Sequence, residues 1–386
     1  MKKVVNILLS LPMKENKSFV TVNNKRFHYI WLRDNCLSET SRHPSSFTKL
    51  YDFSKEKEIP KPNSVKLTDE ELIIDWDEDP PHRSIFPIEW LMTYAYDRNQ
   101  DDHKDKHKES QSRYPEEFLW NKALLENYLS EWENSSFGVS QGWKDRLFRY
   151  GFSLIHDLTP QKHQDFLASI GPMLHTEAGA FYDIEYKPGA NDLADTCHHL
   201  NPHTDYTNRD FPHLLTCFYM VENESIGGES ILVDGFRVAK DFGEKYPHYF
   251  RLLAQTPIQF RQLYQDWQYF YTRSRSIFKL HDSGDLVAIT FAHFHVSNWN
   301  LPFEQMEEFY QAYATFFNYL KNPDYQYCFR MEKGDCLLMN NNRILHGRKS
   351  FDLSSGSRLL RVGYVIWDHI TGRENFQQYK DLYLSK

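Results

Sequence analysis

The chain has 386 residues, with 45 Lys and Arg against 53 Asp and Glu and a net charge of −8. Because it has no basic excess and no apolar run as long as a membrane span, we expect neither a nucleic acid nor a membrane as its partner. The five cysteines are scattered and odd in number, which indicates a reducing compartment rather than a disulfide framework.

The first 100 residues predict a small β-rich domain, residues 1–100. The apolar run Val4–Leu11 is short and interrupted, and no small-residue cleavage site follows it. We therefore expect no signal peptide and a cytoplasmic protein. Residues 19–22 and 26–31, with Asn23, Asn24 and Lys25 between them, predict a hairpin. Residues 101–115 have almost no apolar side chains and predict a linker.

The remainder of the chain, residues 116–386, predicts a larger β-rich domain with helices at its start and one inserted helix. A strand, a turn and the beginning of a second strand follow each other closely, so that His346 lies near the start of a strand. Helical patterns cover about 116–134, 138–149, 160–170 and 303–320, and the strand, turn and strand cover 335–339, 340–343 and 344–346.

Two short stretches about 140 residues apart carry the most informative chemistry. One contains His203 and Asp205, and the other contains His346. Two imidazoles and one carboxylate hold non-haem Fe(II) on one face and leave the other positions open. On a strand, His-x-Asp would direct both side chains to one side, where they could reach a common ion. This spacing is common by chance, but the strand context of His346 favours a metal centre.

A long run of aliphatic and aromatic residues, 358–367, predicts a strand that carries a buried cation. Its period of two places Arg358, Leu360, Val362 and Tyr364 on one face and Arg361 on the other. A buried guanidinium requires a carboxylate partner, and its planar fork suits a bidentate one. That partner is either an Asp of the protein or the distal carboxylate of 2-oxoglutarate.

With these residues identified, the chain resembles the gamma-butyrobetaine/trimethyllysine dioxygenase group of the Fe(II)/2-oxoglutarate oxygenases, to which the taurine dioxygenases are more distantly related. The resemblance covers nearly the whole chain, and several motifs occur in the family's order. They are Trp31-Leu32-Arg33-Asp34-Asn35-Cys36, Asn191-Asp192-Leu193-Ala194, His203-Thr204-Asp205, Gly227-Gly228-Glu229-Ser230 continuing to Phe236, and Asn342-Arg343-Ile344-Leu345-His346-Gly347-Arg348.

The resemblance implies an α+β fold rich in strands, with a double-stranded β-helix (jelly-roll) catalytic domain, flanking helices and the small N-terminal domain. It implies that His203, Asp205 and His346 bind Fe(II), that Arg358 anchors 2-oxoglutarate and that Ser230 touches this co-substrate. With O₂, such a site hydroxylates an unactivated C–H bond of a small molecule and releases succinate and CO₂.

Relatives in this group often carry a structural zinc held by three cysteines and one histidine. This chain retains Cys36 and His82, but has Ser38 and Ser41 where the other two cysteines would fall. A hydroxyl replaces a thiolate poorly on Zn²⁺, and a nearby His43 does not complete a convincing set. We expect that the zinc site has been lost.

The substrate pocket also departs from the best-known relatives, in which aromatic side chains surround a quaternary ammonium. Tyr182 and Tyr364 remain as cage candidates, but Ala178 and Asp195 replace two further tyrosines. A carboxylate can accept hydrogen bonds from an ammonium that has N–H groups, which a trimethylammonium lacks. We expect a small amine, amino acid or betaine-like substrate, and we expect Asp195 to favour one with an exposed N–H group over a trimethylated one. The alternative is that Asp195 caps a turn or pairs with a neighbour such as Lys187.

Asp205 favours hydroxylation or desaturation over halogenation, because related halogenases have a small residue in its place. Desaturation or another oxidation on the same fold, a cupin-type dioxygenase and a non-catalytic binding protein remain alternatives. The sequence leaves a homodimer open.

Overall fold

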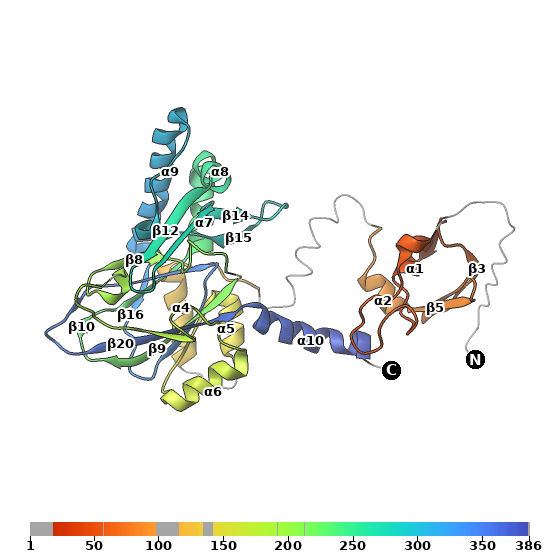
Figure 1. The fold of residues 1–386 in the computed structure, drawn as a ribbon, viewed down its shortest axis with the longest axis horizontal. Coiled ribbons are helices and arrows are strands. Elements are labelled where there is room, and N and C mark those ends of the chain that lie inside the picture. The colour runs from red at the N-terminus through yellow and green to blue at the C-terminus, as the bar shows by residue number, and fades with distance from the viewer. Residues whose placement is uncertain are drawn as a thin grey trace. The chain divides into compact units, whose positions relative to one another are not determined.

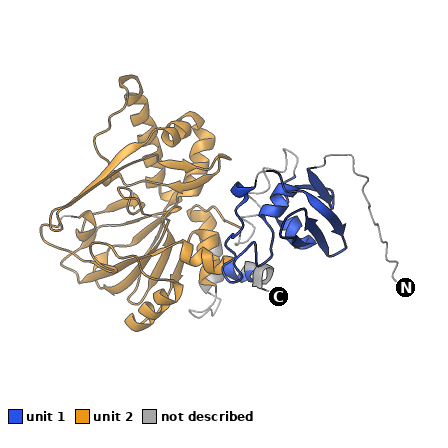
Figure 2. Ribbon diagram, turned by 45° about the vertical axis from the view of Figure 1, so that its right-hand side comes forward, with its two compact units in different colours: residues 1–110, 376–386 blue, residues 111–375 orange. Residues whose placement is uncertain are grey.

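The computed structural model describes residues 18–56, 58–97, 116–133, 142–190, 192–211 and 213–384. The chain divides into two compact units, residues 1–110 with 376–386 and residues 111–375 (Figure 2). The segment Val4–Leu11 and the predicted linker 101–115 lie outside the described residues, so the predicted domain boundaries remain a prediction.

The first unit is built on a hairpin and a three-stranded sheet. Asn23 and Asn24 have φ of 46° and 63°, as a tight hairpin turn requires. The second strand of the hairpin ends at His28, three residues earlier than expected, because Tyr29 begins a helix whose Tyr29 and Leu32 pack into the core. The elements are β1 (Phe19–Val22), β2 (Lys25–His28), α1 (Tyr29–Asp34), η1 (Phe53–Lys55), β3 (Pro62–Leu67), β4 (Glu71–Trp76), β5 (His82–Pro87) and α2 (Ile88–Thr93).

Two antiparallel sheets form the centre of the second unit (Figure 1). The five-stranded sheet has the order β6 (Phe152–Ile155), β17 (Cys336–Asn340), β9 (Leu214–Asn223), β20 (Arg358–Ile366), β7 (Phe181–Ile184). The four-stranded sheet has the order β16 (Tyr327–Phe329), β11 (Ser230–Asp234), β18 (Ile344–Arg348), β8 (Leu200–His203). The fold is therefore strand-rich and of the α+β class.

The rest of the second unit consists of helices and smaller strand pairs, and its last helix continues into residues assigned to the first unit. The helices are α4 (Lys122–Glu133), α5 (Trp143–Tyr150), α6 (Pro160–Ile170), α7 (Gly235–Lys245), α8 (Pro247–Gln255), α9 (Phe303–Lys321) and α10 (Asp368–Leu384), with short η3 (Leu193–Asp195), η4 (His293–His295) and η5 (Pro323–Tyr325). The strand pairs are β10 (Ile226–Gly227) with β19 (Phe351–Asp352), β12 (Ile258–Tyr264) with β13 (Tyr269–Arg275), and β14 (Phe278–Leu280) with β15 (Leu286–Ile289).

The core between the sheets is apolar. Phe218 and Val362 of the five-stranded sheet pack in one cluster with Leu232 and Ile344 of the four-stranded sheet. The other face of the five-stranded sheet packs against α5 and α6, and α7 to α9 pack with β12 and β14 in a separate cluster. Burial of this apolar surface favours the face-to-face arrangement of the two sheets.

A fully buried ion pair fixes the turn that leads to His346. Arg343 and Asp234 lie 2.7 Å apart, and neither side chain is exposed. Asp234 also caps the N-terminus of α7, and Arg343 donates to the backbone carbonyls of Phe118 and Arg149. A buried charge is tolerated only when it is paired and fully hydrogen-bonded. This requirement explains why the motif from Gly227 to Phe236 contains Asp234 and the motif from Asn342 to Arg348 contains Arg343.

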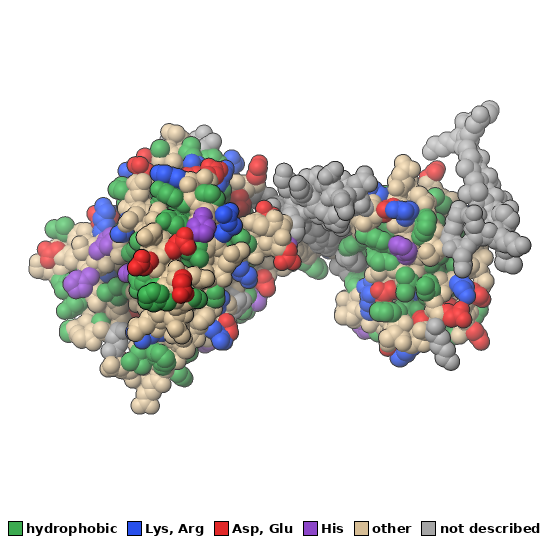
Figure 3. Space-filling view, turned by 90° about the horizontal axis from the view of Figure 1, so that it is seen from above, with side chains coloured by type: hydrophobic (Ala, Val, Ile, Leu, Met, Phe, Trp, Pro, Cys, Tyr) green, Lys and Arg blue, Asp and Glu red, His purple; other side chains and the backbone are tan. Residues whose placement is uncertain are grey.

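The surface that Figure 3 shows has Lys and Arg side chains interspersed with Asp and Glu. Among the described residues, no helix combines the length and apolar character that crossing a membrane requires.

Candidate active site

His203 and His346 face each other across the pairing of β8 with β18. They are direct partners in the register, and their ring centroids lie 4.3 Å apart. Gly347 permits this pairing, since a Cβ there would lie 2.4 Å from the backbone oxygen of Leu200. The register itself therefore brings together two histidines that are 143 residues apart.

The His-x-Asp spacing predicts that Asp205 lies on the same strand as His203, but the structure places it outside that strand. β8 ends at His203, and Asp205 lies in the turn that follows. The side chain of Asn341 accepts a hydrogen bond of 2.9 Å from the Asp205 backbone N–H and donates one of 3.1 Å to its carbonyl. These two hydrogen bonds direct the carboxylate toward the histidines. The alternation of side chains along a strand, which was expected to orient it, does not do so.

The three side chains form a group that could hold a metal ion. Asp205 Oδ1 lies 3.7 Å from His203 Nε2 and 3.6 Å from His346 Nε2, and all three ligand atoms lie within 4.8 Å of one another. His203 Nδ1 lies 3.0 Å from the carbonyl of Asn201, which favours a proton on Nδ1 and a free lone pair on Nε2. Burial lowers the pKa of both histidines, so each imidazole is neutral, as metal binding requires.

Arg358 is a buried cation for which the described part of the chain supplies no carboxylate. Its Nε has no hydrogen-bond partner, and burial together with Arg348 and Arg330 lowers its pKa to about 9. A Cβ at Gly228 would lie 3.1 Å from this Nε, so a glycine leaves room beside the guanidinium. Ser230 is also buried and is paired with Arg348 in the sheet. Of the two partners considered for Arg358, an Asp of the protein is not found among these residues.

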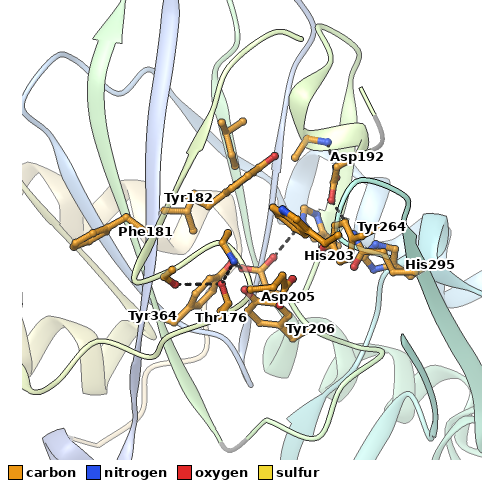
Figure 4. Close-up of a pocket in the computed structure, with 18 of the residues that line it drawn as sticks. Thr176, Phe181, Tyr182, Asp192, His203, Asp205, Tyr206, Tyr264, His295 and Tyr364 are labelled. Carbon is orange, nitrogen blue, oxygen red and sulfur yellow. Dashed lines mark hydrogen bonds and ion pairs between the residues drawn. The ribbon is translucent and has the colours of Figure 1, made fainter. Parts of the chain in front are cut away.

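A pocket that includes His203 and Asp205 of the metal-binding group is lined by several aromatic side chains (Figure 4). Tyr182 and Tyr364 both line it, as expected for cage candidates, and Ala178 forms part of the wall. The hydroxyl of Tyr364 donates to Asp205 Oδ2. The other lining residues include Phe181, Tyr206, Tyr264, Trp267, Phe294 and Val362, with the polar Glu177, Asp192, Gln262 and His295.

Asp195 is buried behind this wall rather than in it. Its Oδ2 lies 3.1 Å from Lys187 Nζ and also accepts a hydrogen bond from the Tyr182 hydroxyl. The ion pair with Lys187, which was the alternative interpretation, is thus present, and Asp195 is not among the lining residues. The aspartate orients Tyr182 and has no direct contact with the pocket.

Asp192, unlike Asp195, does line the pocket, together with Glu177 and the candidate iron ligand Asp205. Its Oδ1 accepts from the backbone N–H of Ala194 at 2.9 Å, and its Oδ2 accepts from Gln262 Nε2 at 2.8 Å. Burial and the charges of Asp195 and Asp205 raise the pKa of Asp192. The sequence placed Asp192 in a motif without giving it a role, because its pocket partner Gln262 lies 70 residues away.

A second acidic side chain of the wall, Glu177, is neutralised within the protein. Both of its oxygens accept from Arg209, and the Arg209 guanidinium stacks 3.8 Å from the centroid of the Tyr271 ring. No sequence pattern indicated a role for Glu177 or Arg209. Apart from the candidate iron ligand Asp205, Asp192 is therefore the carboxylate of the pocket lining that has no cationic partner among the described residues.

The first unit brings together the residues that would hold a zinc in relatives. Cys36 Sγ lies 3.2 Å from His82 Nε2 and 3.3 Å from Ser38 Oγ. Ser41 Oγ accepts from Arg33 Nη1 at 3.1 Å, and Arg33 also pairs with Glu78. Two good ligands beside a guanidinium do not fit Zn²⁺, which prefers four.

The donor set in the second unit, by contrast, fits Fe(II) with open positions, and the protein is a dioxygenase of the Fe(II)- and 2-oxoglutarate-dependent class. The family model described as taurine catabolism dioxygenase TauD, TfdA family matches residues 128–364. The chain belongs to this family.

Individual relatives agree with the family. The chain is 26% identical over 351 residues to gamma-butyrobetaine dioxygenase of Pseudomonas sp. (strain AK-1), covering 90% of this chain and 89% of that protein. It is 26% identical over 359 residues to mitochondrial trimethyllysine dioxygenase of Bos taurus, covering 90% and 82%. A taurine dioxygenase structure from Burkholderia xenovorans superposes with a TM-score of 0.45 at 13% identity, covering 60% and 85%.

Proposed function

We propose that the protein hydroxylates a C–H bond of a small substrate that carries an ammonium group with N–H donors. His203, Asp205 and His346 would hold Fe(II), and 2-oxoglutarate and O₂ would be its co-substrates. When bound, the iron and the co-substrate supply the oxidation, in which one oxygen atom enters the substrate and the other enters succinate as CO₂ leaves. The observation that carries the proposal is the group of two buried imidazoles and one partly buried carboxylate at a pocket with several aromatic side chains.

Arg358 is proposed to bind the distal carboxylate of 2-oxoglutarate. A buried guanidinium is stabilised by a bidentate carboxylate, and none pairs with it among the described residues. Gly228 leaves space next to it, and the hydroxyl of Ser230 is proposed as a further contact. The absence of a partner in the described chain favours an external anion over a structural ion pair.

Recognition of the substrate is proposed to depend on Asp192 rather than on Asp195. The partly buried carboxylate of Asp192 lines the pocket, and two neutral N–H donors leave its charge unbalanced. An ammonium with N–H groups could donate to it, while the rings of Tyr264 and Trp267 cover the alkyl part of the substrate and exclude water. The relatives are named for trimethylated compounds, but Ala178 leaves this cage with one aromatic wall fewer than the resemblance implies.

Matched pairs of compounds test this substrate class. The protein, reconstituted with Fe(II) and 2-oxoglutarate in air, is offered lysine against trimethyllysine and gamma-aminobutyrate against gamma-butyrobetaine. We expect succinate release and a mass gain of one oxygen with an unmethylated member, and a substantially higher KM for that compound in Asp192→Asn. Turnover of the trimethylated members alone, unaffected by Asp192→Asn, would contradict the role of Asp192. Loss of two hydrogens would indicate desaturation.

The finer features of the fold and the setting are proposed on structural grounds. The two face-to-face antiparallel sheets support a double-stranded β-helix for residues 116–386, preceded by the small domain over 1–100. All five cysteines are free, which supports a reducing, cytoplasmic setting. A homodimer remains open, and gel filtration with light scattering tests it.

A further inference from the structure

The β12–β13 hairpin forms one side of the substrate pocket, yet few backbone contacts hold it there. Among the described residues, its strands pair only with each other beyond the bridge between Phe260 and Val296. Tyr264 and Trp267, near its turn, line the pocket, whereas the side chains of Leu263 and Phe270 are 53% and 59% exposed. A two-stranded hairpin is marginally stable alone, so side chains must hold it over the pocket.

Gln262 is placed to do this, because both ends of its amide are used. Its Nε2 donates to Asp192 Oδ2 at 2.8 Å, and its Oε1 accepts from Asn208 Nδ2 at 3.1 Å. The carboxylate can only accept, which assigns the NH₂ of Gln262 to the side of Asp192. Asn208 is 1% exposed and lies in the turn that begins at Asp205. One amide thus connects the hairpin, the pocket carboxylate and the turn of an iron ligand.

We infer that Gln262 is a positioning residue that determines how tightly the substrate ammonium is bound. Its amide holds Oδ2 of Asp192 in place through one hydrogen bond. Through the other, to Asn208, it holds the hairpin that carries Tyr264 and Trp267 against the pocket. The inference rests on the proposed role of Asp192, and it adds that this role depends on a residue from a different segment. A second set of contacts holds the hairpin further along β13, where Asp210 forms ion pairs with Arg273 and Arg275. Removal of the Gln262 amide should therefore increase the mobility of the hairpin without detaching it from the pocket.

Gln262→Met tests the inference, because methionine keeps the length of the side chain and removes both hydrogen bonds. Gln259→Met is the matched control, since Gln259 lies on the same strand and is exposed. Backbone hydrogen exchange is measured in both variants without substrate. We expect faster exchange over residues 261–273 in Gln262→Met and unchanged exchange in Gln259→Met. Equal exchange in the two variants overturns the inference, whether or not the protein turns over any of the four compounds above.

Kinetics with whichever of those four compounds the wild type oxidises test the consequence for binding. Loss of a hydrogen bond to a charged group predicts a rise of roughly tenfold in the substrate KM, with kcat and the KM for 2-oxoglutarate within about twofold of the wild type. In an Asp192→Asn background the same substitution should have a smaller effect, because the two residues act together. An unchanged KM, or full additivity, overturns the positioning role. Absence of succinate release by the wild type with all four compounds contradicts the proposed function instead.

Discussion

The hydroxyl of Tyr364 donates a hydrogen bond of 3.1 Å to Asp205 Oδ2, while Oδ1 of the same carboxylate faces the two imidazoles. Tyr364 lines the pocket as a cage residue would, but its hydroxyl is committed to a candidate iron ligand. One residue therefore joins the pocket wall to the candidate metal-binding group.

Tyr364→Phe should weaken iron binding, because contacts that orient a ligand typically contribute about 10–100-fold in metal affinity or activity. Titration of the apoprotein with Fe(II) under anaerobic conditions measures the effect. Tyr269→Phe, at an exposed position on the hairpin, is the control. Iron affinity equal to that of the control would show that the contact does not orient Asp205.

His203→Ala or His346→Ala should abolish stoichiometric Fe(II) binding and succinate release, because each removes one of three ligands. Far-UV circular dichroism should remain that of the wild type. His248→Ala is a suitable control, since His248 is exposed and pairs with Glu308 on the surface. Full iron occupancy in either ligand variant would refute the assignment.

Arg358→Met should weaken binding of 2-oxoglutarate by about 2–5 kcal/mol, the usual cost of removing one partner of a buried charge pair. Arg361→Met should leave it unchanged, because the guanidinium of Arg361 pairs with Asp183 at 2.7 and 2.8 Å on the other face of β20. Isothermal titration with 2-oxoglutarate compares the two variants. The assignment of faces is wrong if Arg361 proves to be the sensitive residue.

The purified protein should contain no zinc in its first unit, and Ser38→Cys/Ser41→Cys should acquire one Zn²⁺ by completing the set of Cys36 and His82. Elemental analysis by mass spectrometry measures the metal content. Ser45→Cys/Ser46→Cys adds two thiols at exposed positions nearby and controls for adventitious binding. Stoichiometric zinc in the wild type that is lost in Cys36→Ala would contradict the prediction.

Features with a strong local pattern could be predicted from the sequence. The strand 358–366 carries Arg358 inside and Arg361 outside because its side chains alternate, and a helix was expected over 303–320 where α9 lies. The turn before His346 followed from three consecutive asparagines.

Features that depend on a distant partner could not be predicted. Asp205 leaves the strand because Asn341, 136 residues away, holds its backbone. Asp195 is directed to Lys187, and Asp192 to Gln262, by contacts that form only in the folded chain. The alternation of side chains and the family pattern carry no information about such contacts.

Because His203 is paired with His346, an iron ion bound by both would cross-link neighbouring strands. β8 has four residues, lies at the edge of its sheet and has β18 as its partner strand. A ligand that binds only the folded form adds its binding free energy to the stability, about 2.7 kcal/mol at a free concentration a hundredfold above its Kd. Without iron, β8 should therefore separate from β18 before the rest of the sheet unfolds. This separation would expose unpaired backbone groups of the kind that promote association between chains. The metal that serves the chemistry would then also protect the protein against aggregation.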